Sequence, residues 1–185
     1  NAEADSLNAA VLAPDVKVGG DIWYRFLNNV VTDIRQKAGQ KCTAVRRILV
    51  PASLVDEVRT ALVGRLKKTS IGDPSIEGVR MGALATRTQV ERLREAVDKL
   101  SGQQEMVYGP LSDFELQGGS REHGAFFPPV LFQNSKPFEN TLVHEVEAFG
   151  PVSTIIPYND LEEAAQLTAL GKGSLVSSIV SSDDN

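Results

Sequence analysis

The sequence is poor in the residues that build covalent or metal-bound scaffolds. It contains one cysteine and two histidines among 185 residues. A single cysteine cannot form a disulfide within the chain, which excludes a secreted, disulfide-stabilised scaffold. One cysteine and two histidines are also too few for a cysteine-rich zinc site. We therefore expect no bound metal ion.

Long apolar segments are absent as well. The uninterrupted apolar runs are only a few residues long, far below the ~20 residues that span a bilayer. The N-terminus lacks the basic stretch followed by an apolar one that marks a secretory signal peptide. Lysine and arginine total 19 against 24 acidic residues, and the net charge of −5 argues against non-specific nucleic-acid or membrane-surface binding. These features predict a cytoplasmic protein that binds neither nucleic acid nor membranes.

The remaining composition is that of a folded globular chain. Hydrophobic residues make up 42% and charged residues 23% of the sequence. A chain of this length is expected to form one domain. It begins with Asn rather than Met, and it ends in Ser-Ser-Asp-Asp-Asn directly after the apolar run 175–180. From both ends we expect a fragment of a longer protein.

The spacing of apolar residues predicts strands that alternate with helices. Strands are expected at 9–13, 45–50, 106–108, 152–157 and 175–180, and helices at 21–37, 53–68, 86–100 and 159–170. The Gly-rich segments 69–83 and 109–124 are expected to be loops. The prolines in 126–132 predict an edge strand or an extended segment there. This alternation favours an α/β fold with a largely parallel sheet flanked by helices.

Cys42 is the first candidate functional residue. It lies in the connection between a predicted helix and a predicted strand, a common location for catalytic groups. The thiolate is the reactive form of cysteine, and the neighbouring charges of Lys41, Arg46 and Arg47 would favour it. Spacing alone leaves a second interpretation open, because unpaired cysteines are among the most often buried residues.

Two separated segments resemble the aldehyde dehydrogenase superfamily. Residues 39–42, Gly-Gln-Lys-Cys, are similar to its catalytic-cysteine signature Gly-Gln-x-Cys, and residues 147–152 are similar to its Glu-x-Phe-Gly-Pro-Val. Pro74 and the segment 126–132 also fit the family pattern. The resemblance covers essentially the whole chain. It implies that residues 1–185 are part of an aldehyde-dehydrogenase-like catalytic domain, with the dinucleotide-binding and oligomerisation parts absent.

The N-terminal segment points to a particular subgroup of this superfamily. Most family members carry Glu-Leu-Gly-Gly-Lys-Ser where residues 3–8 read Glu-Ala-Asp-Ser-Leu-Asn. This departure resembles the dehydrogenase part of the bifunctional phenylacetate-degradation ring-opening proteins, which combine an oxepin-CoA hydrolase with a semialdehyde dehydrogenase. The resemblance implies oxidation of a CoA-linked semialdehyde with NADP. The sequence leaves open whether NADP or NAD is preferred and whether a hydratase half is present.

The resemblance also implies roles for four residues. Cys42 would be the nucleophile, and Glu3 would be the general base. Glu147 would hold the nicotinamide ribose hydroxyls, and Phe149 would pack near the nicotinamide. The complete protein would be a homo-oligomer acting on a small-molecule aldehyde, and the fragment alone would be inactive.

Alternative interpretations remain open for the chain and for these residues. The chain could be a CoA-acylating dehydrogenase, although the Glu-containing N-terminal motif argues against it, or a non-catalytic α/β interaction module. Glu3 could be a solvated terminal carboxylate, Glu147 a charge on a helix surface, and Phe149 a core residue. His123 and His144 have no Ser or Cys partner at a diagnostic spacing, so we expect surface or hydrogen-bonding roles for them.

Overall fold

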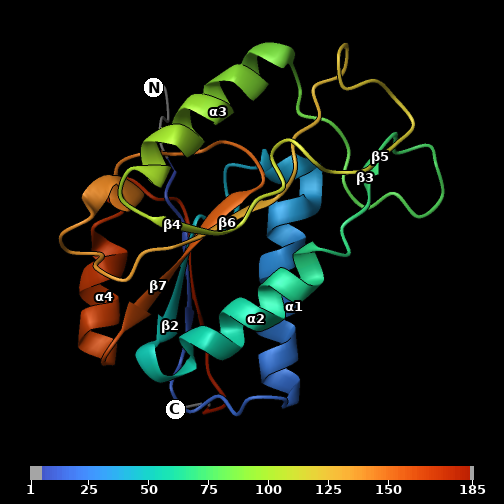
Figure 1. The fold of residues 1–185 in the computed structure, drawn as a ribbon. Helices are drawn as coiled ribbons and strands as arrows, with labels where there is room; N and C mark the ends of the chain where they lie inside the picture. Colours follow the sequence, from blue (N-terminus) through green and yellow to red (C-terminus); the bar gives the residue numbers. More distant parts are fainter. Residues whose placement is uncertain (1–5, 184–185) are drawn as a thin grey trace.

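A six-stranded sheet forms the centre of the structure, a computed structural model that describes residues 6–183 (Figure 1). Its strand order is β4-β6-β7-β2-β1-β8, and neighbouring strands run parallel except that β4 is antiparallel to β6. The strands are β1 (Ala9–Leu12), β2 (Arg47–Pro51), β4 (Glu105–Tyr108), β6 (Val130–Gln133), β7 (Val152–Tyr158) and β8 (Ser177–Val180). The predicted α/β fold with a largely parallel sheet is confirmed.

Helices cover both faces of this sheet (Figure 1). Helices α1 (Asp21–Arg35) and α2 (Val55–Leu66) pack on one face, and α4 (Leu161–Ala169) packs on the other. Helix α3 (Arg87–Ser101) packs on β6 and the start of β7. No helix within residues 6–183 is long and apolar enough to cross a membrane.

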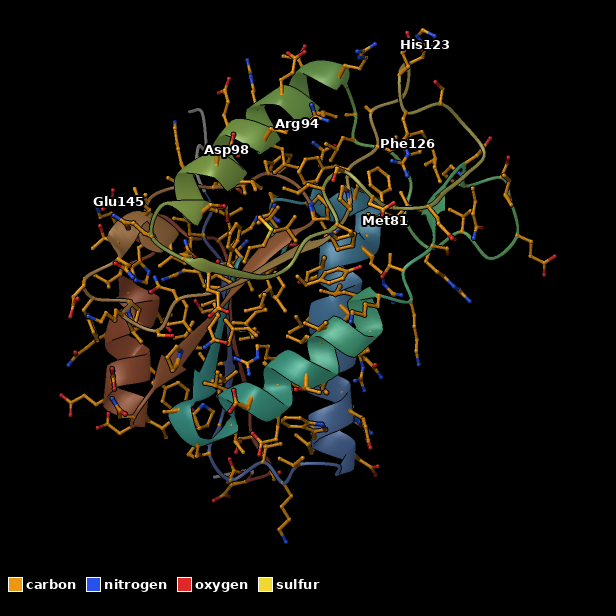
Figure 2. The ribbon with its side chains drawn as sticks, in the orientation of Figure 1. Met81, Arg94, Asp98, His123, Phe126 and Glu145 are labelled. Atoms are coloured by element: carbon orange, nitrogen blue, oxygen red, sulfur yellow. The ribbon has the colours of Figure 1, made fainter. Side chains whose placement is uncertain are left out.

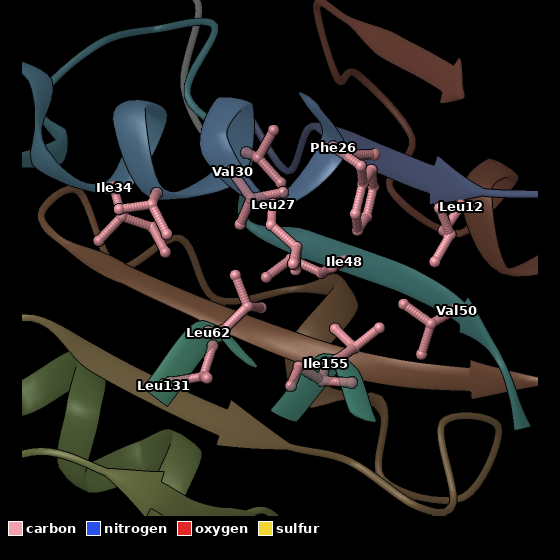
Figure 3. Packing of buried hydrophobic residues seen from close by; sticks show 14 of the residues in the cluster. Leu12, Phe26, Leu27, Val30, Ile34, Ile48, Val50, Leu62, Leu131 and Ile155 are labelled. Carbon is pink, nitrogen blue, oxygen red and sulfur yellow. The ribbon is translucent and has the colours of Figure 1, made fainter. Parts of the chain in front are cut away.

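The largest core cluster lies between the sheet and helices α1 and α2 (Figure 3). Successive strand residues point to opposite faces of a sheet, so alternate residues of β2 enter different cores. Ile48 and Val50 pack against α1 and α2, whereas Leu49 packs toward α4. The apolar residues of α1 recur every three or four positions, which buries one helix face completely. Its buried members are Trp23, Phe26, Leu27, Val30, Val31 and Ile34.

One expectation about the sheet was wrong, and one about the loops was incomplete. The segment 126–132 does not form an edge strand, because β6 lies between β4 and β7. Its two prolines precede Val130, so they remove no hydrogen-bond donor from the ladder. The loops 69–83 and 109–124 also contain a two-residue parallel pair, β3 (Ile71–Gly72) with β5 (Leu116–Gln117). Such a short pair has no detectable periodicity in the sequence.

His144 is buried against Arg47, which confirms a hydrogen-bonding role. Its Nε2 lies 3.0 Å from the carbonyl oxygen of Pro137, and its Nδ1 lies 3.1 Å from Nη1 of Arg47. A carbonyl oxygen can only accept, so Nε2 carries the proton and Nδ1 accepts from Arg47. Burial, and then the charge of Arg47, lowers the pKa of His144 to about 4. His123, in contrast, is exposed and points outward (Figure 2).

The depressed pKa of His144 predicts that acid destabilises the fold. An unfolded histidine takes up a proton near pH 6.5, whereas folded His144 does so only near pH 4. The stability contribution is therefore complete above pH 6.5 and is lost as the pH falls toward 4. We expect this group to reduce the free energy of unfolding by about 3 kcal/mol across that window. Denaturant unfolding at several pH values would measure the effect.

Variants of the two histidines supply the test and its control. His144→Gln should flatten the pH dependence between pH 6.5 and 4, whereas His123→Gln should leave it unchanged because His123 is exposed. A wild-type pH dependence in His144→Gln would contradict the prediction.

Candidate active site

Three loops meet at one edge of the sheet, where the parallel strands begin. Residues 6–8 lead into β1, residues 37–46 lead into β2, and residues 147–151 lead into β7. The amino ends of parallel neighbours lie at the same edge. The fold therefore brings the segment of Cys42 to the segment of Glu147, although the two are far apart in the sequence.

A left-handed turn precedes Cys42. Lys37, Ala38 and Gly39 follow α1 with φ angles of 52°, 52° and 70°. This conformation costs a residue with a side chain roughly 1–2 kcal/mol, but it costs glycine nothing comparable. A Cβ at position 39 would also collide with the carbonyl oxygen of Gly150. Gly39 is thus required for the backbone conformation and for the close contact between the Cys42 loop and the 147–151 loop.

Arg46 links the Cys42 loop to the 147–151 loop from the interior of the protein. It is 5% exposed, and its Nη1 and Nη2 donate to the carbonyl oxygens of Gly150 and Gly39, each at 2.8 Å. Its Nε lies 3.5 Å from Oε1 of Glu147, and its guanidinium lies 5.6 Å from the ring centre of Phe149. Burial lowers the pKa of Arg46, and the Glu147 carboxylate opposes that shift. The Arg46 side chain therefore contacts both the Cys42 loop and the 147–151 loop.

Glu147 and Phe149 occupy different environments. The Glu147 side chain is 11% exposed and lies in a loop, where its Oε2 accepts from the Ser6 backbone N–H at 3.1 Å. The alternative of a helix-surface charge is wrong. The ring of Phe149 is 39% exposed with Arg46 at one face, so the alternative of a core residue is also wrong. A largely buried carboxylate and an accessible aromatic residue thus lie two residues apart.

Cys42 itself is exposed, so the alternative of a buried structural cysteine is wrong. The three cations near it in sequence all have other partners. Lys41 Nζ lies 2.7 Å from Asp33, Arg46 faces Glu147, and Arg47 turns to His144. Their contacts therefore do not support the suggestion that these charges favour the Cys42 thiolate. Within residues 6–183 the Cys42 backbone N–H donates no hydrogen bond to the protein, so it can serve an anion.

Sequence inspection missed two residues that support the site. The Gln40 side chain donates to Gln89 at 2.7 Å and to the Phe149 carbonyl at 3.4 Å, and it accepts from the Ala85 N–H at 2.8 Å. It lies in the Gly-Gln-x-Cys signature, which was the available signal. Asn8 donates to the Cys42 carbonyl at 2.8 Å, and nothing in its spacing pointed to this contact.

Glu3, the predicted base, lies outside the described residues. The segment that follows it does reach the site, since Ser6 contacts Glu147.

Comparison with known proteins identifies the family. The family model described as Aldehyde dehydrogenase family matches residues 2–185. The chain belongs to the aldehyde dehydrogenase family. The resemblance to this family that the sequence indicated is thereby confirmed.

Individual relatives agree with this assignment. The 3,4-dehydroadipyl-CoA semialdehyde dehydrogenase of Aromatoleum evansii is 39% identical over 183 residues, which are 99% of this chain and 36% of that protein. The alpha-ketoglutaric semialdehyde dehydrogenase of Bacillus subtilis (strain 168) is 32% identical over 150 residues, 81% of this chain and 30% of that protein. The aldehyde dehydrogenase chain described here thus spans about a third of the length of these curated relatives.

Solved structures show the same fold. A betaine aldehyde dehydrogenase from Staphylococcus aureus in complex with NAD⁺ superimposes with a TM-score of 0.80 at 24% identity. The match covers 97% of this chain and 34% of that chain. At this identity the likeness establishes the fold of the aldehyde dehydrogenase chain.

Proposed function

We propose that the protein containing this chain is an NAD(P)-dependent aldehyde dehydrogenase that oxidises an aldehyde to a carboxylic acid. The observation that carries the proposal is the exposed Cys42 on a loop that Gly39 and Arg46 join to the Glu147–Phe149 segment. The loop that carries Cys42 is thereby joined to the loop that carries Glu147 and the accessible Phe149. Residues 1–185 would be part of the catalytic domain, and the dinucleotide-binding and oligomerisation parts would come from the rest of the protein.

The side chains at this edge fit a nicotinamide dinucleotide. A carboxylate can accept hydrogen bonds from two adjacent sugar hydroxyls. Because Oε1 of Glu147 is buried beside Arg46 and Oε2 accepts from the Ser6 N–H, the side chain would have to turn outward to bind a ribose. The exposed ring of Phe149 offers an apolar surface to a planar heterocycle. In this proposal Glu147 holds the nicotinamide ribose, and Phe149 packs near the nicotinamide. The bound cofactor supplies the hydride acceptor.

Cys42 prepares the aldehyde for oxidation. Attack of its thiolate on the carbonyl carbon forms a C–S bond and moves the carbonyl electron pair onto oxygen, which gives a thiohemiacetal. The Cys42 backbone N–H can donate to the developing oxyanion. Re-formation of the C=O bond would release hydride to the nicotinamide acceptor that a bound cofactor would supply, and a thioester would remain on Sγ of Cys42.

Glu3 completes the reaction in this proposal. Its carboxylate takes a proton from water, the water oxygen bonds to the thioester carbon, and the C–S bond breaks to release the acid and the thiol. Such general-base catalysis is typically worth 10²–10⁴-fold. The support for Glu3 is its place as the glutamate of the motif at residues 3–8.

The substrate is proposed to be a CoA-linked semialdehyde formed in phenylacetate degradation. Support comes from the 39% identity to a 3,4-dehydroadipyl-CoA semialdehyde dehydrogenase. The Glu-Ala-Asp-Ser-Leu-Asn motif at residues 3–8 agrees with this assignment.

The test is cofactor reduction by the complete protein that contains this sequence. We expect reduction of NADP⁺ or NAD⁺ with a CoA-linked semialdehyde and weaker reduction with simple aldehydes. Glu3→Gln should give a burst of about one reduced cofactor per Cys42 and then turn over 10²–10⁴-fold more slowly, because the thioester is not hydrolysed. Asp5→Asn, a neighbouring carboxylate change, is the control and should keep steady-state turnover.

Other outcomes would overturn parts of this proposal. Normal steady-state turnover in Glu3→Gln would remove the base assignment. Turnover that requires free CoA would indicate a CoA-acylating enzyme instead. No reduction with any aldehyde, in protein shown to be folded, would favour a non-catalytic interaction module.

A further inference from the structure

Asn8 lies buried beneath the Cys42 loop, and every polar atom of its side chain is used. It is 1% exposed. Its Nδ2 donates to the carbonyl oxygens of Cys42 and Ala44 at 2.8 and 3.0 Å. Its Oδ1 accepts from the Ser6 hydroxyl at 2.8 Å and from the backbone N–H groups of residues 175–176 at 3.1 and 2.9 Å. One amide thus joins three segments that are distant in sequence.

The partners of Asn8 determine the orientation of its amide. The amide nitrogen must face the two carbonyl oxygens, and the amide oxygen must face the two N–H groups. A flipped amide would place oxygen against oxygen and N–H against N–H. The contacts are therefore specific for asparagine, because an apolar or acidic side chain of similar size cannot supply two donors and one acceptor.

The main chain of Asn8 extends this support. Its carbonyl oxygen accepts from the N–H groups of Arg46 and Arg47 at 3.1 and 3.0 Å. Residue 8 therefore holds the Cys42 loop at its tip through the side chain and at its end through the backbone. The same residue accepts from Ser6, whose own N–H donates to Glu147.

Fixing the direction of the Cys42 carbonyl also restricts the backbone conformation of Cys42. The peptide bond between Cys42 and Thr43 is planar and trans, so a carbonyl directed at Asn8 determines the plane of that bond. The plane in turn restricts the rotation about the Cα–C bond of Cys42, and so the direction in which the side chain leaves its Cα. Without the Asn8 amide, this peptide could rotate, and the direction of Sγ would vary with it.

We propose that Asn8 is the positioning residue of the Cys42 nucleophile, an inference that rests on the proposed function. Its amide fixes the backbone at Cys42 and thereby the direction of Sγ toward the carbonyl of the aldehyde. Loss of the amide slows the attack on the aldehyde and leaves binding of the cofactor largely intact. Misplacement of a reacting group by about 1 Å can cost 10²-fold in rate.

A second buried asparagine provides a matched control. Asn134 is 0% exposed, and its Nδ2 donates to the Asn140 carbonyl at 2.8 Å. It follows β6, at the opposite edge of the parallel sheet from Cys42. Replacing it by alanine removes a buried amide of the same kind without touching the site.

The experiment compares Asn8→Ala, Asn8→Ser and Asn134→Ala with wild type in the complete protein. The readouts are the rate of the first-turnover burst of reduced cofactor, the KM for cofactor, the rate of Cys42 alkylation by iodoacetamide, and the thermal midpoint. We expect Asn8→Ala to slow the burst about 10- to 100-fold with a KM change below threefold. Its alkylation rate should change at least threefold. Asn134→Ala should lower the thermal midpoint and leave the burst and alkylation rates at wild-type values.

A purely structural role for Asn8 would give a different result. In that case Asn8→Ala would resemble Asn134→Ala, with a lower thermal midpoint and a burst rate within twofold of wild type, and the proposal would be overturned. If Asn8→Ala does not fold, Asn8→Ser, which keeps a short polar group, decides by the same criteria. Absence of aldehyde oxidation in wild type would overturn the proposed function. The alkylation rates would still test Asn8, and unchanged rates would overturn its positioning role.

Discussion

Cys42→Ala is expected to lower aldehyde-dependent cofactor reduction by about 10⁴-fold or more, which is the range seen when a catalytic nucleophile is removed. Without Sγ no thiohemiacetal forms, and the aldehyde carbon has no route to release hydride. The measurement is the steady-state and burst rate of cofactor reduction by the complete protein.

The same substitution should hardly affect folding. Cys42 is exposed, and surface substitutions of this kind usually change the free energy of unfolding by less than about 0.5 kcal/mol. Thr43→Ser, in the same turn, is a suitable control because it should keep both stability and activity. Cofactor reduction that persists in folded Cys42→Ala would contradict the assignment of the nucleophile.

Arg46→Met is expected to produce the largest loss of stability among substitutions at the site, about 3–5 kcal/mol. The change leaves the carbonyl oxygens of Gly39 and Gly150 without their buried donors. It also removes the guanidinium beside the Glu147 carboxylate. Denaturant unfolding measures the loss, and the KM for cofactor should rise because the 147–151 loop is no longer held.

Two further variants make the Arg46 prediction specific. Arg46→Lys should recover little of the lost stability, because one ammonium group cannot reproduce the planar fork that reaches both loops. Arg94→Met is the control, since Arg94 is exposed on α3 (Figure 2) and its replacement should change stability by less than about 0.5 kcal/mol. An Arg46→Met protein as stable as Arg94→Met would contradict this account.

The sequence predicted the elements whose apolar pattern is long enough to be distinctive. The pattern over 21–37 predicted a helix, and α1 spans Asp21–Arg35. The run 152–157 predicted a strand, and β7 spans Val152–Tyr158. The interior position of β6 was not predicted. It depends on β4 pairing along the outer side of β6, and the local sequence does not show which strands pair. Local pattern specifies an element, whereas its neighbours depend on the whole chain.

The site was predicted in part for the same reason. The signatures around Cys42 and Glu147 could be found in the sequence, and the fold brings their loops together. The directions of Arg46 and Arg47 could not be predicted from composition. These residues are adjacent in an extended segment, so their side chains leave on opposite sides, one toward Glu147 and one toward His144. The role of Asn8 depends on contacts with residues 34 to 168 positions away.

The placement of β1 between β2 and β8 has a consequence for the order of events during synthesis. Asn8 and Cys42 are synthesised before residues 175–176, whose N–H groups complete the Asn8 contacts. At translation speeds of about 5–20 residues per second, the thiol emerges on the order of ten seconds before its support is complete. The nascent protein therefore carries an exposed cysteine before it has an assembled site.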